Sequence, residues 1–307
     1  LEPFAAFNAL ALTLPAFGWW AASLWIRRTS GSWVSAVLLA FPFGMGLHVF
    51  RDLNWYTIEK AAVGFLALFA VCLWRAWEEG GHWRWLAALA FLLMAWMNLY
   101  LALVGAAGTA MALLLDPRSR NLWAACVGSA LAALPLVWLQ WSLLQGTQTL
   151  GDPEIYLYQR AMLDSFELFP PTWNRLEGWR ALNLPVLLLG LWGARTRRGR
   201  ALLAVAAGLF ALSLGPQLAE GVWNPLYMLL RELLPGFWRV AKPEVFFEGS
   251  YLLLMASAGM ALRRPLPRWL YLPLVLGWVL IVRSHPVFPG FSAFQQWELN
   301  PNWEQHL

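Results

Sequence analysis

Charged residues are scarce in this chain: they make up 13% of its 307 residues, whereas hydrophobic residues make up 60%. Soluble globular domains carry about 25% charged residues, so this composition excludes an ordinary soluble domain. The chain also lacks a phosphate-binding loop, a dinucleotide-binding glycine fingerprint, a His-Glu-x-x-His motif and a closely spaced cysteine pair. Its two cysteines, Cys72 and Cys126, lie inside apolar segments and are interpreted as small buried hydrophobic residues.

Long apolar segments fill most of the chain. A membrane-spanning helix needs about 20 mostly apolar residues, and the 22 Trp residues often lie near segment ends, as is typical of membrane interfaces. We divide the run 84–115 at the polar pair around Asn98 and Tyr100. The predicted fold class is an all-α, polytopic transmembrane helix bundle of about ten spans: 5–26, 33–50, 58–75, 84–97, 100–115, 121–144, 181–194, 200–217, 248–262 and 269–283.

Arginine alternates from gap to gap between these segments. The Arg-rich gaps hold thirteen of the 22 Lys and Arg residues and only three of the 17 acids (the gaps are 27–28, 75–84, 116–120, 195–200 and 263–268). An excess of Lys and Arg marks the cytoplasmic loops of membrane proteins. The pattern therefore predicts a multi-pass protein of the bacterial cytoplasmic membrane with its acidic loops outside. The net charge of +5 is spread over short loops, which argues against nucleic-acid binding.

Three external loops are long: residues 46–60, 146–180 and 216–248. They are rich in aromatic and apolar residues, so we expect short interfacial helices, one capped by Asn224 and ended by Pro235-Gly236, another within 152–171. Residues 1–284 are expected to form one transmembrane domain, and 285–307 an external tail that starts a further segment. Because the chain begins at Leu1 without Met or a signal-peptide layout, we expect a fragment with at least one span missing upstream.

The third loop carries two cations and two carboxylates among aromatic residues: Arg239, Lys242, Glu244 and Glu248. A guanidinium fork and a mobile ammonium suit a lipid phosphate. The alternative is an interfacial cluster of snorkelling side chains with internal ion pairs.

The other two loops hold further candidates. His48, Arg51 and Asn54 could contact a polar headgroup or a sugar, although a helix-connecting turn is an equal alternative. Asp164 and Glu167 are three residues apart, so on a helix they share a face and could hold or activate a sugar hydroxyl. The alternative for this pair is a solvated helix face.

The order of these features resembles the bacterial GT-C-type membrane glycosyltransferases. The resemblance rests on a basic turn followed by Ser-Gly, a polar stretch after the next span, a hairpin with Asn and Tyr, and a Pro-rich region. In this chain the basic turn is 27–31, the polar stretch is 48–54 and the hairpin is 98–100. The Pro-rich region comprises 163–170, 214–216, 224–227 and 234–244. The chain departs from the family where Glu244 and Phe246 stand near the position of a second arginine. The family's catalytic carboxylate would lie upstream of Leu1.

The resemblance implies an inverting transfer of sugar from a polyprenyl-phosphate donor on the extracytoplasmic face. It implies that Arg239 and Lys242 bind the lipid phosphate, that His48 and Arg51 support them, and that Asp164 and Glu167 act on hydroxyls, with a possible divalent metal ion (Mg or Mn) assisting. The expected partners are membrane lipid and the lipid-linked donor. Three other functions stay open: a lipid-linked glycan ligase or polymerase, a transporter or flippase, and a non-catalytic scaffold. Spans with almost no midspan charge favour surface chemistry over translocation.

Overall fold

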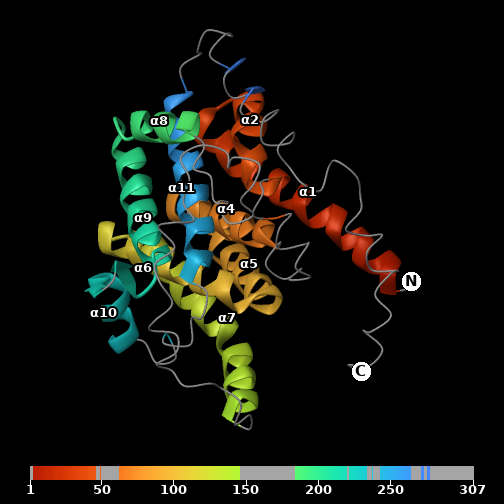
Figure 1. Ribbon diagram of the computed structural model, residues 1–307, viewed down its shortest axis with the longest axis vertical. Helices are drawn as coiled ribbons and strands as arrows, with labels where there is room; N and C mark the ends of the chain where they lie inside the picture. Colours follow the sequence, from red (N-terminus) through yellow and green to blue (C-terminus); the bar gives the residue numbers. More distant parts are fainter. Residues whose placement is uncertain are drawn as a thin grey trace.

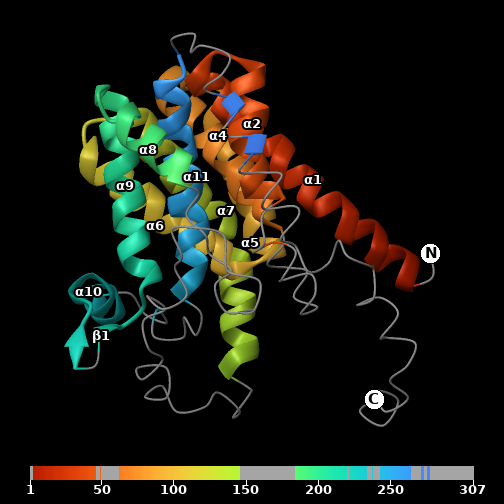
Figure 2. The same cartoon turned by 45° about the horizontal axis from the view of Figure 1, so that its top comes forward.

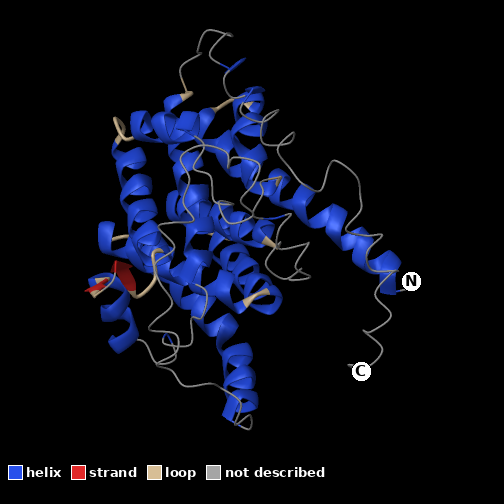
Figure 3. Ribbon diagram, in the orientation of Figure 1, coloured by secondary structure: helices blue, strands red, loops and turns tan. Residues whose placement is uncertain are grey.

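The computed structural model describes residues 3–45, 49, 62–145, 184–219, 221–233, 237, 243–263, 271–272 and 275–276. Over these residues the protein is all-α, and strand is limited to one short antiparallel pair (Figure 3). The elements are α1 Pro3–Ser30, α2 Trp33–Gly44, α4 Val63–Glu79, α5 Trp83–Met97, α6 Leu99–Leu115, α7 Arg120–Gln145, α8 Leu184–Gly193, α9 Arg197–Ser213, β1 Gln217–Ala219, β2 Val222–Trp223, α10 Pro225–Leu233, η4 Pro243–Val245 and α11 Phe246–Ala261.

Local signals set the helix boundaries. Asn98 ends α5 and caps α6, because its side-chain oxygen accepts from the backbone N–H groups of Tyr100 and Leu101. Thr196 caps α9 in the same way through the N–H of Gly199. Gly80 and Gly81 both take positive φ angles, which lets the chain turn sharply from α4 into α5. These boundaries confirm the predicted division of 84–115 at Asn98.

Helix α11 occupies the centre of the molecule. It packs against α8 and α9 on one side and against α1 and α2 on the other (Figure 1). Nearly every residue from Phe246 to Met260 is buried, as expected for a helix that is apolar all round. By contrast, the N-terminal half of α1 and the C-terminal half of α7 extend away from the bundle (Figures 1 and 2).

Glycines allow the helix backbones to approach closely. A Cβ atom at Gly193 of α8 would overlap the carbonyl oxygen of Ser257 on α11. One at Gly44 of α2 would overlap the backbone of Trp19 on α1. Contacts of this kind, through small residues, are typical of helix interfaces in membrane proteins.

The helices coincide with nine of the ten predicted segments, with shifted ends. Helix α4 continues past residue 75 to Glu79 because Glu78 and Glu79 pair with arginines, and it stops at Gly80. Helix α9 ends at Ser213 rather than 217, since Gly215 takes a φ of 77° and the next residues pair as strands. The predicted interfacial helix is α10, and Asn224 accepts from the N–H of Tyr227 at its start.

The lengths of the helices bear on the predicted number of membrane spans. Among the described residues, one stretch is long and apolar enough to cross a membrane by itself, Arg120–Leu139 within α7. Several other helices at predicted spans are shorter than the expected ~20 residues, because turns or capping residues end them early: α2 has 12 residues, α5 has 15 and α8 has 10. The structure therefore shows the helical class, and one of the predicted spans meets the length for crossing a membrane by itself.

Several predicted features lie outside the described residues. They are the interfacial helix at 152–171, the loop 146–180, nearly all of the loop 46–60, most of the span 269–283 and the tail 285–307.

Candidate functional site

Turns from distant parts of the chain meet at one end of the helices. Glu78 at the end of α4 accepts from Arg28 at the end of α1 (3.4 Å) and from Arg198 at the start of α9 (2.7 Å). Arg28 also pairs with Glu79. One carboxylate thus joins three of the helix ends that carry arginine.

The other two Arg-rich turns, at 116–121 and at 263, contact the same group of helix ends. Arg84 donates to the side-chain oxygen of Asn121 at the start of α7, and the indole N–H of Trp77 donates to Asp116 at the end of α6 (2.9 Å). After α11, Arg263 Nε donates to the carbonyl oxygen of Thr29 (2.8 Å). The five Arg-rich gaps therefore lie together, and we call these turns (27–31, 75–84, 116–121, 193–200 and 263) the basic end.

The opposite end holds the segment 214–250, which follows α9. Helix α9 begins at the basic end and has 17 residues, so its last residue, Ser213, lies about 25 Å away. Figure 2 shows β1 and α10 beyond that end of α9. Asn224, which is buried, connects the parts: its side-chain N–H groups donate to the carbonyl oxygens of Ala211 (2.6 Å) and Gly215 (2.9 Å).

Aromatic rings and a proline complete this unit. The ring of Phe237 lies 5.1 Å from that of Tyr227 on α10 and 6.1 Å from that of Phe246 on α11. Pro243 of η4 lies against Gly215, where a Cβ atom would be 3.1 Å from the proline ring. Described residues from three separate pieces of the sequence (214–216, 224–227, and Phe237 with 243–246) therefore form one local structure.

Glu248 is the buried carboxylate of this end. Its side chain lies in the first turn of α11 and the residue is 7% exposed. The helix macrodipole favours a negative charge at that position. Next to it, Gly249 contacts Val104 of α6, and the hydroxyl of Ser250 donates to the carbonyl oxygen of Ala206 (2.8 Å). Glutamate side chains are seldom buried to this extent, so Glu248 is a candidate functional group of this end.

In the sequence, Glu248 lies in the third loop and is not among the predicted site residues. One signal was available: it is the single charged residue in the apolar run 245–262. Burial could not be inferred, because a charge near the mouth of a helix is more often solvated.

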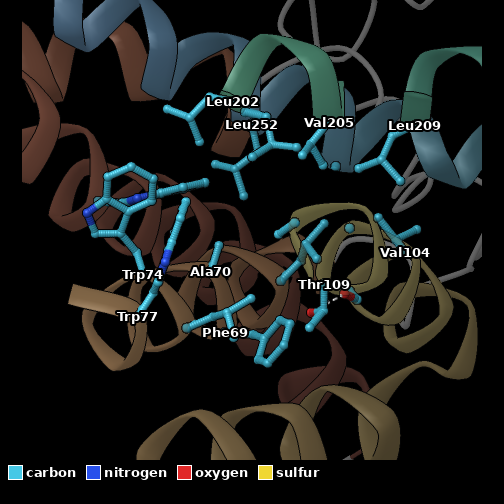
Figure 4. Close-up of a pocket in the computed structure, with 18 of the residues that line it drawn as sticks. Phe69, Ala70, Trp74, Trp77, Val104, Thr109, Leu202, Val205, Leu209 and Leu252 are labelled. Carbon is cyan, nitrogen blue, oxygen red and sulfur yellow. Dashed lines mark hydrogen bonds between the residues drawn. The ribbon is translucent and has the colours of Figure 1, made fainter. Parts of the chain in front are cut away.

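An apolar cavity of about 90 Å³ lies between α4, α6, α9 and α11 (Figure 4). Trp74, Trp77 and Phe69 form one wall, and leucine and valine side chains of α9 and α11 face them (Figure 4). The hydroxyl of Thr109 is satisfied, since it donates to the carbonyl oxygen of Gly105 (2.7 Å). The cavity runs from Trp77, near the basic end, to Gly249, next to Glu248. Such walls accept hydrocarbon and exclude ions.

Most predicted site residues fall outside the described residues: His48, Arg51, Asn54, Asp164, Glu167, Arg239 and Lys242. Glu244 is placed in η4, at the 214–250 segment. Phe237 and Pro243, which flank Arg239 and Lys242 in the sequence, both lie there too. Within the described part of the chain, no three His, Cys, Asp or Glu side chains are placed to hold a metal ion.

Comparisons of the chain with protein-family models, with curated proteins and with solved structures found no match.

Proposed function

We propose that this chain is a multi-spanning membrane protein. The observation that carries the proposal is a pair of apolar stripes on exposed helix faces. On α5, Trp85 (76% exposed) and Trp96 (70%) enclose Leu89 and Leu93. These positions lie on one helix face, about 16 Å long at 1.5 Å per residue.

Helix α7 repeats the pattern. Trp123 and Trp138 enclose exposed Val127, Leu131 and Leu134, over about 22 Å. Both helices begin at the basic end, so Trp85 and Trp123 lie on that side and Trp96 and Trp138 on the other. Apolar faces between two levels of Trp are typical of lipid-facing surfaces, whereas single scattered apolar residues are the norm on soluble monomers. The positive-inside rule then puts the basic end in the cytoplasm.

Cysteine labelling tests this topology. In a background with Cys72→Ser and Cys126→Ser, we would introduce Arg200→Cys at the basic end and Glu232→Cys on α10. Both native side chains are exposed, so neither change disturbs the packing. An impermeant maleimide added to intact cells should label position 232 and not position 200. Labelling of position 200 alone would show that the orientation is the opposite of the proposed one. Labelling of both positions only after the cells are lysed would reject the membrane assignment.

We propose further that the end opposite the arginines transfers a sugar from a polyprenyl-phosphate donor. The support is that described residues from three sequence pieces that resemble the GT-C enzymes (Gly215, 224–227, and Phe237 with Pro243) lie together at the end that holds buried Glu248. In this proposal Arg239 and Lys242 neutralise the departing lipid phosphate, which is the charge that develops in the transition state. A carboxylate, with Asp164 and Glu167 as candidates, removes the proton of the acceptor hydroxyl. Glu248 lies at the mouth of α11 and not at its centre, so it does not favour translocation.

Release of polyprenyl phosphate tests the activity without knowledge of the acceptor. Native membranes containing the full chain would be given a panel of synthetic polyprenyl-phosphate hexoses and pentoses. We expect release above that of membranes without the chain, and its loss in Arg239→Ala. Arg231→Ala, on α10 of the same end, is the matched control and should retain release. If membranes with and without the chain released equal amounts of polyprenyl phosphate from every donor, the proposed transferase activity would be rejected.

A further inference from the structure

A second cavity lies at the basic end, on the side of the molecule formed by α1, α4 and α5. Its volume is about 740 Å³, within the 300–1,000 Å³ that is usual for ligand sites. Three arginines line it, Arg27, Arg28 and Arg75, and most of the remaining wall is leucine, valine and tryptophan. Trp25 and Trp74, whose ring centroids are 6.2 Å apart, line both this cavity and the apolar one in Figure 4.

The charge around this cavity is unbalanced. Arg28 and Arg198 share Glu78, and Arg28 and Arg75 share Glu79, with Arg75 Nε 3.9 Å from the carboxylate. Arg27 lies over the ring of Trp33 at 4.2 Å and pairs with no carboxylate among the described residues. The four guanidinium groups outnumber the two carboxylates, which leaves an excess of positive charge for an anion.

The apolar wall continues onto the lipid-facing surface. Leu86, Leu89 and Leu93 of α5 line the cavity and are also exposed, and Leu89 and Leu93 belong to the stripe between Trp85 and Trp96. The arginines of the cavity thus lie at the same end of α5 as Trp85. Its apolar wall continues along α5 from there toward Leu93. This arrangement matches an amphiphile with an anionic head and apolar chains.

We propose that this cavity binds an anionic phospholipid of the cytoplasmic leaflet, with the headgroup phosphate on Arg27 and Arg75 and an acyl chain along Leu86, Leu89 and Leu93. The proposal rests on the membrane location proposed above and not on the transferase activity. It assigns the basic end a ligand distinct from the lipid-linked donor, which is proposed to act about 25 Å away. Basic pockets between membrane helices on the cytoplasmic side are suited to anionic headgroups.

Lipid binding to the purified full chain tests the proposal. In detergent, dioleoylphosphatidylglycerol should bind and raise the unfolding temperature, whereas dioleoylphosphatidylcholine should do neither. The double variant Arg27→Gln with Arg75→Gln should weaken phosphatidylglycerol binding on the order of thirtyfold. Arg75 also lies over the Trp83 ring (4.1 Å), so Arg27→Gln alone is the variant that keeps the fold intact, with a loss of about fivefold.

Arg118→Gln is the matched control. It removes one exposed charge from the basic end but does not line the cavity, and we expect a change of at most about twofold because salt screens exposed charges. Equal binding of the two lipids, or an equal loss in Arg118→Gln, would overturn the proposal. Complete competition by millimolar inorganic phosphate would show a phosphate site and not a lipid site. A chain found outside the membrane fraction would instead reject the proposed membrane location itself.

Discussion

At the basic end, charged side chains from five distant turns meet at the surface, whereas the 214–250 segment at the other end holds the buried carboxylate of Glu248. Glu78 pairs with arginines that are 41% and 54% exposed, so solvent and salt weaken those contacts. Glu248 is nearly excluded from solvent. The difference teaches that charge counts identify the end that is predicted to be cytoplasmic, whereas burial identifies the carboxylate that is the better candidate for chemistry.

Glu248→Gln should have the largest effect. If the carboxylate supports sugar transfer, the loss of its charge should reduce the release of polyprenyl phosphate by about 100-fold, the scale of one preorganised electrostatic group. Glu232→Gln on α10, an exposed position, should change release by less than twofold. A matching loss of thermal stability in Glu248→Gln would show a structural role only, so unfolding temperatures would be measured on both variants.

Glycine substitutions compare how tightly the two ends are packed. Gly193→Ala at the basic end places a methyl group on the backbone oxygen of Ser257, so a helix must move; we expect a loss of about 2–3 kcal/mol. Gly249→Ala, at the other end, meets side chains of Val104 and Leu209 that can adjust, and should lose about 1 kcal/mol.

Gly128→Ala on α7 is the control, since its nearest neighbour is a methyl group at 3.6 Å. It should be neutral or slightly stabilising, because Ala is favoured over Gly in helices. The measurement is the midpoint of unfolding in detergent. If Gly193→Ala and Gly128→Ala were equally stable, the close approach of α8 and α11 would be wrong.

Asn98→Ala removes a helix cap at the end away from the arginines. Because Asn98 is buried and accepts from two backbone N–H groups, we expect a loss of about 1–2 kcal/mol in unfolding free energy. Asn98→Asp keeps the acceptor oxygen and should recover part of the stability. No recovery would mean that another contact of Asn98, and not the cap, stabilises this turn.

Glu78→Gln should have the smallest effect. Its two arginine partners are largely exposed, so we expect a loss of less than about 1 kcal/mol, and less in 0.5 M salt than in 0.05 M. A double-mutant cycle with Arg198→Gln isolates the 2.7 Å pair. A coupling above 2 kcal/mol would show that the basic end is as desolvated as the environment of Glu248, and the contrast between the two ends would fail.

The sequence predicted what depends on local chemistry. The all-α class, the break at Asn98 and the helix after Asn224 all follow from short-range signals and were confirmed. The ends of α4 and α9 were wrong by four residues each, because ion pairs from Glu78 and Glu79 and the turn at Gly215 set them. These are tertiary contacts that hydropathy does not record.

The candidate site was less predictable. Asn224 was recognised as a cap, but its bonds to Ala211 and Gly215 join elements that only the fold brings together. The packing around Gly249, next to Glu248, depends in the same way on Val104 and Leu209, which come from two other helices. The choice of Arg239, Lys242, Asp164 and Glu167 stays a prediction, since these residues lie outside the described part of the chain.

The central position of α11 has a consequence for biosynthesis. Arg263 bonds to the carbonyl oxygen of Thr29 across 234 residues, so α1 leaves the ribosome long before its neighbour exists. At 5–20 residues per second this delay is roughly 10–50 s. During most of that time the faces of α1 and α2 that α11 later covers have no native partner. Translation that stops before residue 246 would leave a chain whose core is uncovered, and chaperones and proteases act on such chains.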